Sequence, residues 1–169
     1  MIARPAPDDF APYYHAYVDA LTDNDLLAHL RRQPGEWDAM LARADAHHRY
    51  APGKWTVREV AQHVADTERV FAYRALRWAR GDETELPGFD QDAWVPHDPG
   101  QSLPALSAEL AAVRNATLAL VRSLSDEALD RSGIASGRRM TVRAAIWIVA
   151  GHAEHHARIL RERYLTETA

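Results

Sequence analysis

The chain has 169 residues and no cysteine, with 47% hydrophobic residues, 26% charged residues and a formal net charge of −4. This composition is typical of one globular domain with a sizeable core, and it argues against a general nucleic-acid binder, which is usually basic. No apolar run approaches the ~20 residues of a membrane span, and the N-terminus has no apolar signal segment. We therefore expect a single domain over residues 1–169, a cytoplasmic location, and neither nucleic acid nor membrane as a partner. Without cysteine, a metal site would need His, Asp, Glu or water as ligands.

Two helices are predicted in the first third of the chain. A short helix is expected over residues 8–20, where Pro12 falls in the first turn after an aspartate cap. An apolar stripe with helical spacing then runs through residues 23–46 and stays in phase across Pro34-Gly35. This continuity predicts one kinked helix, because proline bends a helix that tertiary packing still holds together.

The next helix carries strong boundary signals. Thr56 followed by Glu59 is a capping-box pattern, and Gly81 is placed to end the helix at about Arg80. Residues 82–102 then show no helical pattern and contain several prolines and glycines. A segment of that length is long enough to cross the length of a bundle, so the helices on either side of it could be parallel.

Two further helices are predicted in the second half. Ser102 caps a helix whose stripe continues to Leu124, and residues 125–129 resemble a single helical turn. Residues 132–139 are interpreted as a loop or short hairpin, and the last helix spans Thr141–Tyr164. Four long amphipathic helices plus a short N-terminal one predict an all-α fold, a four-helix bundle that buries one stripe from each helix.

Histidines interrupt two of these apolar stripes. His152 and His156 occupy core-facing positions of the last helix, four residues apart and therefore on one face. His63 lies between Val60 and Thr67 on the edge of the earlier stripe. Buried imidazoles need partners for their ring nitrogens, and three of them from two facing helices could bind one metal ion. Such a donor set suits Zn, Ni, Cu, Co or Fe(II) and leaves positions open for water or substrate.

Competing interpretations remain open at this stage. The three histidines could be ordinary core residues with satisfied hydrogen bonds. His155 could be a proton shuttle at the rim of the site or a solvated residue, and Asp66 could either orient a ligand imidazole or be a surface acid. Trp94 could cover the pocket. The remaining charged candidates are interpreted as solvated: Arg69, Arg74, Arg77, Arg80, His15, His29, His47, His48 and His97.

Several motifs resemble the DinB/YfiT-like superfamily. They are residues 51–60, which read APGKWTVREV, then His63 and residues 66–69, then residues 86–94, and the final His152-x-x-His155-His156. The resemblance covers roughly residues 10–164. It implies a four-helix bundle with up-down-down-up topology and a long crossover, a divalent metal, often nickel or zinc, on His63, His152 and His156, and a homodimer.

The function that this resemblance implies is less uniform. Related proteins include transferases and isomerases that use a low-molecular-weight thiol such as bacillithiol or mycothiol, and others described as metal-dependent hydrolases. We therefore expect a metal-dependent enzyme, of the S-transferase or hydrolase type, that activates a thiol or water for attack on a small-molecule electrophile in stress or detoxification. The alternative is a non-catalytic metal-binding bundle protein.

Overall fold

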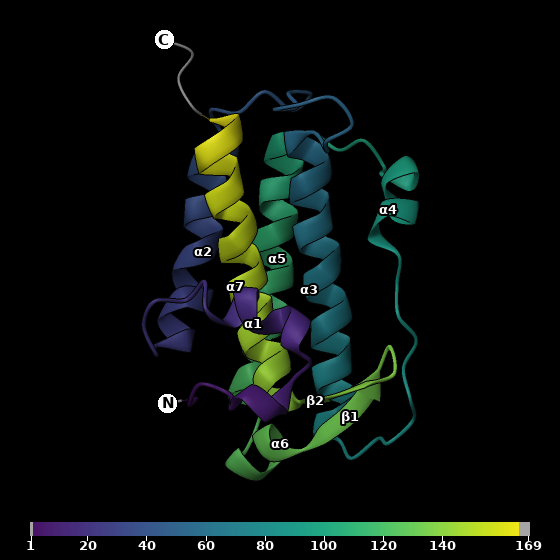
Figure 1. Ribbon diagram of the computed structural model, residues 1–169. Helices are drawn as coiled ribbons and strands as arrows, with labels where there is room; N and C mark the ends of the chain where they lie inside the picture. The colour runs from purple at the N-terminus through teal and green to yellow at the C-terminus, as the bar shows by residue number, and fades with distance from the viewer. Residues whose placement is uncertain (1, 166–169) are drawn as a thin grey trace.

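A computed structural model describes residues 2–165 of the chain as a four-helix bundle (Figure 1). In this view α2 (Leu26–Leu41) and α7 (Val142–Ile159) run upward, while α3 (Val57–Ala79) and α5 (Leu103–Arg122) run downward. Helix α3 packs against both α7 and α5, and α2 completes the bundle against the same two helices. The predicted fold class and up-down-down-up topology are confirmed. None of the helices within the described residues is long and apolar enough to cross a membrane.

The segment between α3 and α5 returns along the outside of the bundle, and this leaves the two helices parallel (Figure 1). It is not structureless, because it contains α4 (Gln91–Trp94) and the 3₁₀ turn η3 (Val95–His97). The prediction that residues 82–102 contain no helix was therefore wrong for residues 91–97. The Asp90 side chain starts α4 by accepting hydrogen bonds from two backbone amides of the turn, a local contact that stripe analysis cannot detect.

Helix α2 continues through Pro34, as predicted, although it begins at an Asp25 cap and ends at Leu41. Proline has no N–H to donate, so the carbonyl of Leu30, four residues earlier, loses its helical partner. Arg114 of α5 supplies the missing donor through Nη1, 3.2 Å from the Leu30 oxygen. A neighbouring helix thus satisfies the backbone group that the proline leaves free.

The N-terminal helix is shorter than expected. Residues 8–20 form two 3₁₀ turns, η1 (Pro7–Asp9) and η2 (Pro12–Tyr14), followed by the four-residue α1 (His15–Val18). Ala11 adopts an extended conformation because a residue before proline is pushed away from the helical region. Helix α1 packs on α7.

The remaining boundaries follow the sequence signals. Thr56 and Glu59 form the predicted capping box, each side chain accepting from the other residue's backbone amide. The predicted single turn is α6 (Asp126–Asp130), and the predicted hairpin is β1 (Ser132–Ala135) paired with β2 (Arg138–Thr141). Helix α7 ends in one π-helical turn, η4 (Leu160–Tyr164).

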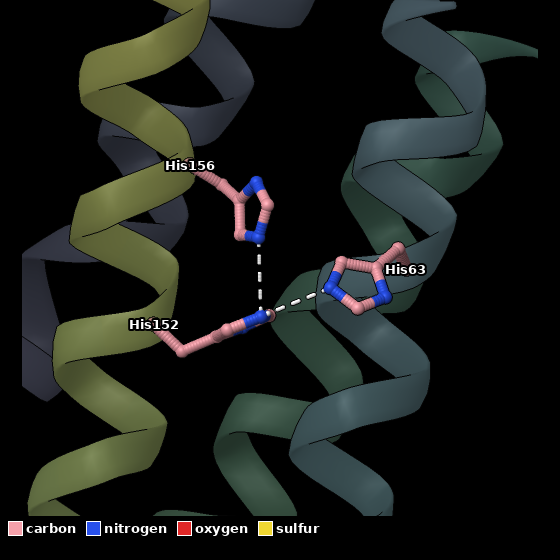
Figure 2. A group of neighbouring side chains, drawn as sticks. All are labelled: His63, His152 and His156. Carbon is pink, nitrogen blue, oxygen red and sulfur yellow. Dashed lines mark hydrogen bonds between the residues drawn. The ribbon is translucent and has the colours of Figure 1, made fainter. Parts of the chain in front are cut away.

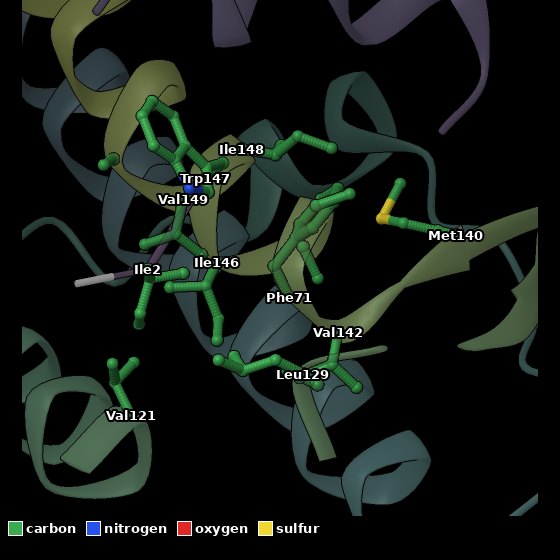
Figure 3. Close-up of a cluster of buried hydrophobic side chains, with 14 of the residues drawn as sticks. Ile2, Phe71, Val121, Leu129, Met140, Val142, Ile146, Trp147, Ile148 and Val149 are labelled. Atoms are coloured by element: carbon green, nitrogen blue, oxygen red, sulfur yellow. The ribbon is translucent and has the colours of Figure 1, made fainter. Parts of the chain in front are cut away.

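The buried apolar side chains form two clusters, one toward each end of the bundle. Figure 3 shows the cluster at the hairpin end, where Phe71 and Met140 meet Val142 and Ile146 of the first turns of α7. The second cluster joins the opposite halves of the same helices, including Trp37, Val60 and Leu160. Between them lies a polar layer made of His63, Glu68, Arg114 and His152, all buried. The candidate site therefore lies at mid-height, framed by two apolar clusters.

Candidate metal centre

Two helices bring the three predicted histidines together. His63 comes from α3, and His152 and His156 lie one turn apart on α7 (Figure 2). The Nε2 atom of His152 lies 3.0 Å from Nε2 of His63 and 3.1 Å from Nε2 of His156. One nitrogen from each residue falls within 4.8 Å of the other two. The spacing rule that placed them on facing stripes is sufficient to explain this convergence.

Burial keeps these imidazoles neutral. Desolvation lowers the pKa of His63 to about 4 and holds the pKa values of His152 and His156 well below the usual range for histidine. The positive charge that each neighbouring histidine would carry lowers the pKa of His152 further. At neutral pH each ring therefore has a lone pair available for a cation.

Hydrogen bonds among the three imidazole rings cannot satisfy all of their Nε2 atoms. A neutral imidazole nitrogen carries either one proton or one lone pair, so Nε2 of His152 cannot make a well-formed hydrogen bond to both neighbours at once. A single divalent ion could accept all three lone pairs. Neutral nitrogen donors with no carboxylate among them fit a transition metal better than magnesium or calcium.

Neighbouring side chains hold the rings in place. The hydroxyl of Thr67 lies 3.4 Å from Nδ1 of His63, which leaves the Nε2 atom of that ring facing the centre. The Trp55 ring packs on His63 at 4.8 Å between centroids, and the Tyr17 ring packs on His152 at 5.1 Å. The sequence did not predict these contacts. Those of Trp55 and Tyr17 join residues on separate segments and depend on the fold, whereas Thr67 lies four residues from His63 on one helix and was overlooked.

Three hollows reach the centre from different sides. A cavity of about 280 Å³ borders His63, one of about 230 Å³ borders His152, and one of about 260 Å³ borders His156. Helix α4 touches all three, through Gln91 in the first two and Asp92 in the third. The crossover segment therefore lies over the site, and Trp94 lines the cavity beside His63, consistent with the expected cover.

The sequence model of the DinB superfamily matches residues 13–160 of the chain. The chain belongs to the DinB superfamily.

Two solved structures share this fold. The structure of YfiT from Bacillus subtilis, described as a probable metal-dependent hydrolase with an unusual four-helix bundle topology, aligns with a TM-score of 0.73 over 95% of this chain and 91% of that one, at 19% identity. A mycothiol-dependent maleylpyruvate isomerase aligns with a TM-score of 0.63 at 19% identity, over 79% of this chain but only 58% of the isomerase. These structural similarities establish the shared fold.

A curated relative is nearer in sequence. OB0413 of Oceanobacillus iheyensis, provisionally named a metal-dependent hydrolase, is 30% identical over 111 residues, which is 63% of this chain and 63% of the relative. The match thus spans somewhat less than two thirds of either protein.

Asp66 and His155, the two further candidates from the sequence, lie at different positions around the three histidines. Asp66 bonds with Gln62 and Arg69 rather than with a ligand imidazole, and it lines the cavity beside His63. Burial raises its pKa. His155 is half-buried rather than solvated, and its ring lies 5.2 Å from that of Tyr17. Burial, followed by the charge of Arg158, lowers the pKa of His155.

Two predictions of solvent exposure were wrong. His29 is 1% exposed, and its Nε2 lies 3.1 Å from a carboxylate oxygen of Asp23. Arg74 is 3% exposed and lines the cavity beside His152. Both residues are three residues from a buried apolar position of their own helix, a spacing that already allowed them to face inward.

A second polar group backs the centre from inside the bundle. Arg114 forms two parallel hydrogen bonds of 2.8 Å to the carboxylate of Glu68 and a third of 2.6 Å to Oε1 of Gln33. Gln33 in turn donates to the carbonyl of Ala150, two residues before His152. This network was missed, although Glu68 and Arg114 interrupt apolar stripes in the same way as the histidines do.

Proposed function

We propose that this chain is a metal-dependent enzyme in which His63, His152 and His156 hold one divalent transition metal, with nickel or zinc the best candidates. The observation that carries this proposal is the convergence of three imidazole nitrogens, two from buried residues and one from the half-buried His156, beside cavities that open to solvent. Neutral nitrogen ligands with open coordination positions are typical of catalytic rather than structural sites.

When bound, such a metal lowers the pKa of a coordinated water or thiol and so supplies a nucleophile at neutral pH. The chain's own residues position the metal ligands. Trp55 and Tyr17 fix the rings of His63 and His152, and α4 lines the hollows that lead to them. The chain has no cysteine, so a sulfur nucleophile would have to come from a small molecule.

In the reaction we propose, the sulfur or oxygen of the nucleophile forms a bond to an electrophilic carbon of a small molecule. The leaving group departs with its bonding electron pair, and the proton of the thiol or water passes to solvent. Relatives support both versions, because OB0413 and YfiT carry hydrolase descriptions while the isomerase is mycothiol-dependent. Detoxification or stress response and a homodimeric assembly remain parts of this proposal.

Metal analysis and paired activity assays test the proposal. Protein purified without a histidine tag should contain, or take up, about one nickel or zinc ion per chain. The loaded protein should then either conjugate mycothiol or bacillithiol to monochlorobimane or hydrolyse 4-nitrophenyl acetate, and chelation should abolish the reaction. One bound metal without turnover in either assay would favour the alternative, a non-catalytic metal-binding bundle. No metal uptake would refute both.

A further inference from the structure

Arg74 is a buried cation that pairs with no carboxylate among residues 2–165. Its side chain lies on α3, is 3% exposed, and donates a hydrogen bond of 3.0 Å from Nη2 to the carbonyl of Pro87. The guanidinium packs over the rings of Phe71 and Phe89, at 5.2 and 5.8 Å from their centroids. Burial lowers its pKa, and the titratable group that acts against this is the phenol of Tyr14, which is neutral at pH 7 and leaves the positive charge uncompensated.

The protein treats its other inward arginines differently. Arg114 is held by the carboxylate of Glu68, and Arg58 lies 3.1 Å from that of Asp98. Each of these ion pairs offsets the cost of removing a guanidinium from water, which amounts to several kcal/mol for an isolated buried ion. Of the two buried arginines in the part of the chain that the structure describes, Arg74 is therefore the one whose charge is left for a ligand in the cavity to neutralise.

The cavity beside Arg74 has the features of a small ligand site. It measures about 230 Å³, and its walls include the aromatic rings of Tyr14, Phe71 and Phe89 together with His152 of the metal centre. Aromatic walls suit the apolar part of a ligand, while a guanidinium matches the geometry of a carboxylate.

The hairpin contributes a polar group to the same cavity. Ser136 and Gly137 form the two-residue turn between β1 and β2, with φ values of 53° and 69°. Such a turn favours glycine, asparagine or aspartate at both positions, so a serine there is held in an uncommon conformation. Its side chain lines the cavity, where a hydroxyl could bond an anionic oxygen.

The neighbouring cavity lacks such a cation. Three carboxylate residues, Glu59, Asp66 and Asp98, line the hollow beside His63, and its lining includes no arginine or lysine. Each of these carboxylates is paired with an arginine outside that lining, so an anion finds its cationic partner on the Arg74 side of the metal centre.

We propose that the cavity between Arg74 and His152 binds the carboxylate of a compact, partly apolar substrate. Arg74 holds the carboxylate, the aromatic walls hold the body of the molecule, and His152 lies where the reacting part would meet the metal. The last statement rests on the proposed function, whereas recognition of the carboxylate by Arg74 does not require a metal.

Benzoate and its neutral counterpart benzamide test this inference on the full-length, metal-free protein. In a titration followed by the NMR signals of the Arg74 Nε–H and the Ser136 amide, benzoate should bind at least tenfold more tightly than benzamide, because a hydrogen bond to a charged group contributes more than one to a neutral group. Equal binding of the two probes, or signal changes confined to residues around Glu59 and Asp66, would overturn the proposal.

Variants separate the arginine from the metal. Arg74→Gln should weaken benzoate binding by tenfold or more, while Arg80→Gln, at the exposed end of the same helix, should leave it unchanged. Benzoate binding that appears only with added zinc and is unaffected by Arg74→Gln would place the carboxylate on the metal and refute the proposal. If Arg74→Gln does not fold, the comparison of the two probes on the unaltered protein still decides. Binding of benzoate by a protein that takes up no metal would sustain this site while refuting the proposed enzyme.

Discussion

The backbone carbonyl of Tyr17 occupies the space that a side chain at position 151 would need. A β-carbon placed on Gly151 would lie 1.9 Å from the Tyr17 oxygen. This close approach lets α1 rest on α7 and brings the Tyr17 ring against both His152 and His155. The glycine before the first α7 histidine therefore positions one wall of the site.

Replacing Gly151 with alanine should destabilise the protein even though alanine is the better helix former. In an open helix position the change would stabilise by about 1 kcal/mol. Here the methyl group meets backbone atoms that cannot rotate away, and overpacking of this kind costs roughly 1–3 kcal/mol or more. Gly35→Ala is the matched control. Gly35 lies in α2, and a β-carbon added there would meet no neighbouring atom within 4 Å. Urea unfolding should show opposite signs for the two variants; stabilisation by both would contradict the packing described.

Substitution of His156 and of His155 should distinguish a metal ligand from a residue at the rim of the site. His156→Ala is expected to lose most of the bound nickel or zinc, because two imidazoles remain where three converged. His155→Ala should retain the metal, since its ring faces Tyr17 and stands outside the cluster. Metal content after dialysis, measured by elemental analysis, distinguishes the two. Unchanged content in His156→Ala would refute the ligand assignment, and loss in both variants would move His155 into the site.

The bundle and the histidine cluster were predictable because both depend on helical spacing. Apolar residues every three or four positions define the buried faces, and His152 and His156 stand out as polar residues on such a face. The same rule also points to Glu68, which follows Val64 by four residues, and to Arg74, which follows Phe71 by three. These two were overlooked because charged residues on a helix are usually solvated.

Other features depend on segments distant in sequence. Arg74 is buried partly because Pro87 and Phe89 of the crossover lie on it, and no local pattern reports that contact. Helix α4 arises from a short side-chain cap at Asp90, and the N-terminal helix is interrupted because Pro12 forces Ala11 out of the helical region. The cavities around the centre follow from these segments, so their shape and charge required the structure.

Acid should destabilise the metal-free protein before its carboxylates titrate. The pKa of His63 is lowered from 6.5 to about 4 on folding, so the unfolded chain binds more protons between these values. The stability linked to this residue is fully present above pH 6.5 and is lost as the pH falls toward 4. Between pH 7.5 and 5.5 the loss linked to His63 is about 1.4 kcal/mol.

Urea unfolding of the metal-free protein at pH 7.5 and 5.5 measures this loss. His63→Gln should reduce it by about one histidine's share, because the replacement does not titrate. Added zinc should raise the stability at pH 7.5, and the gain should shrink at pH 5.5 as protons compete for the ligands. An unchanged pH dependence in His63→Gln would show that this residue is not buried in the neutral form.

The buried pair behind the centre should prove far more sensitive to substitution than a surface pair. Glu68→Gln removes the charge that balances Arg114, which lies 3% exposed between α3 and α2 and is bonded to Gln33 and to the Leu30 carbonyl. Breaking a buried ion pair typically costs 3–5 kcal/mol, because the remaining charge stays uncompensated. Glu36→Gln makes the same chemical change in the exposed Arg32–Glu36 pair and should cost at most about 0.5 kcal/mol. Chemical unfolding of both variants provides the comparison. Similar losses would mean that Arg114 finds another partner or reaches water, and that the polar layer at mid-height is not sealed by the two apolar clusters.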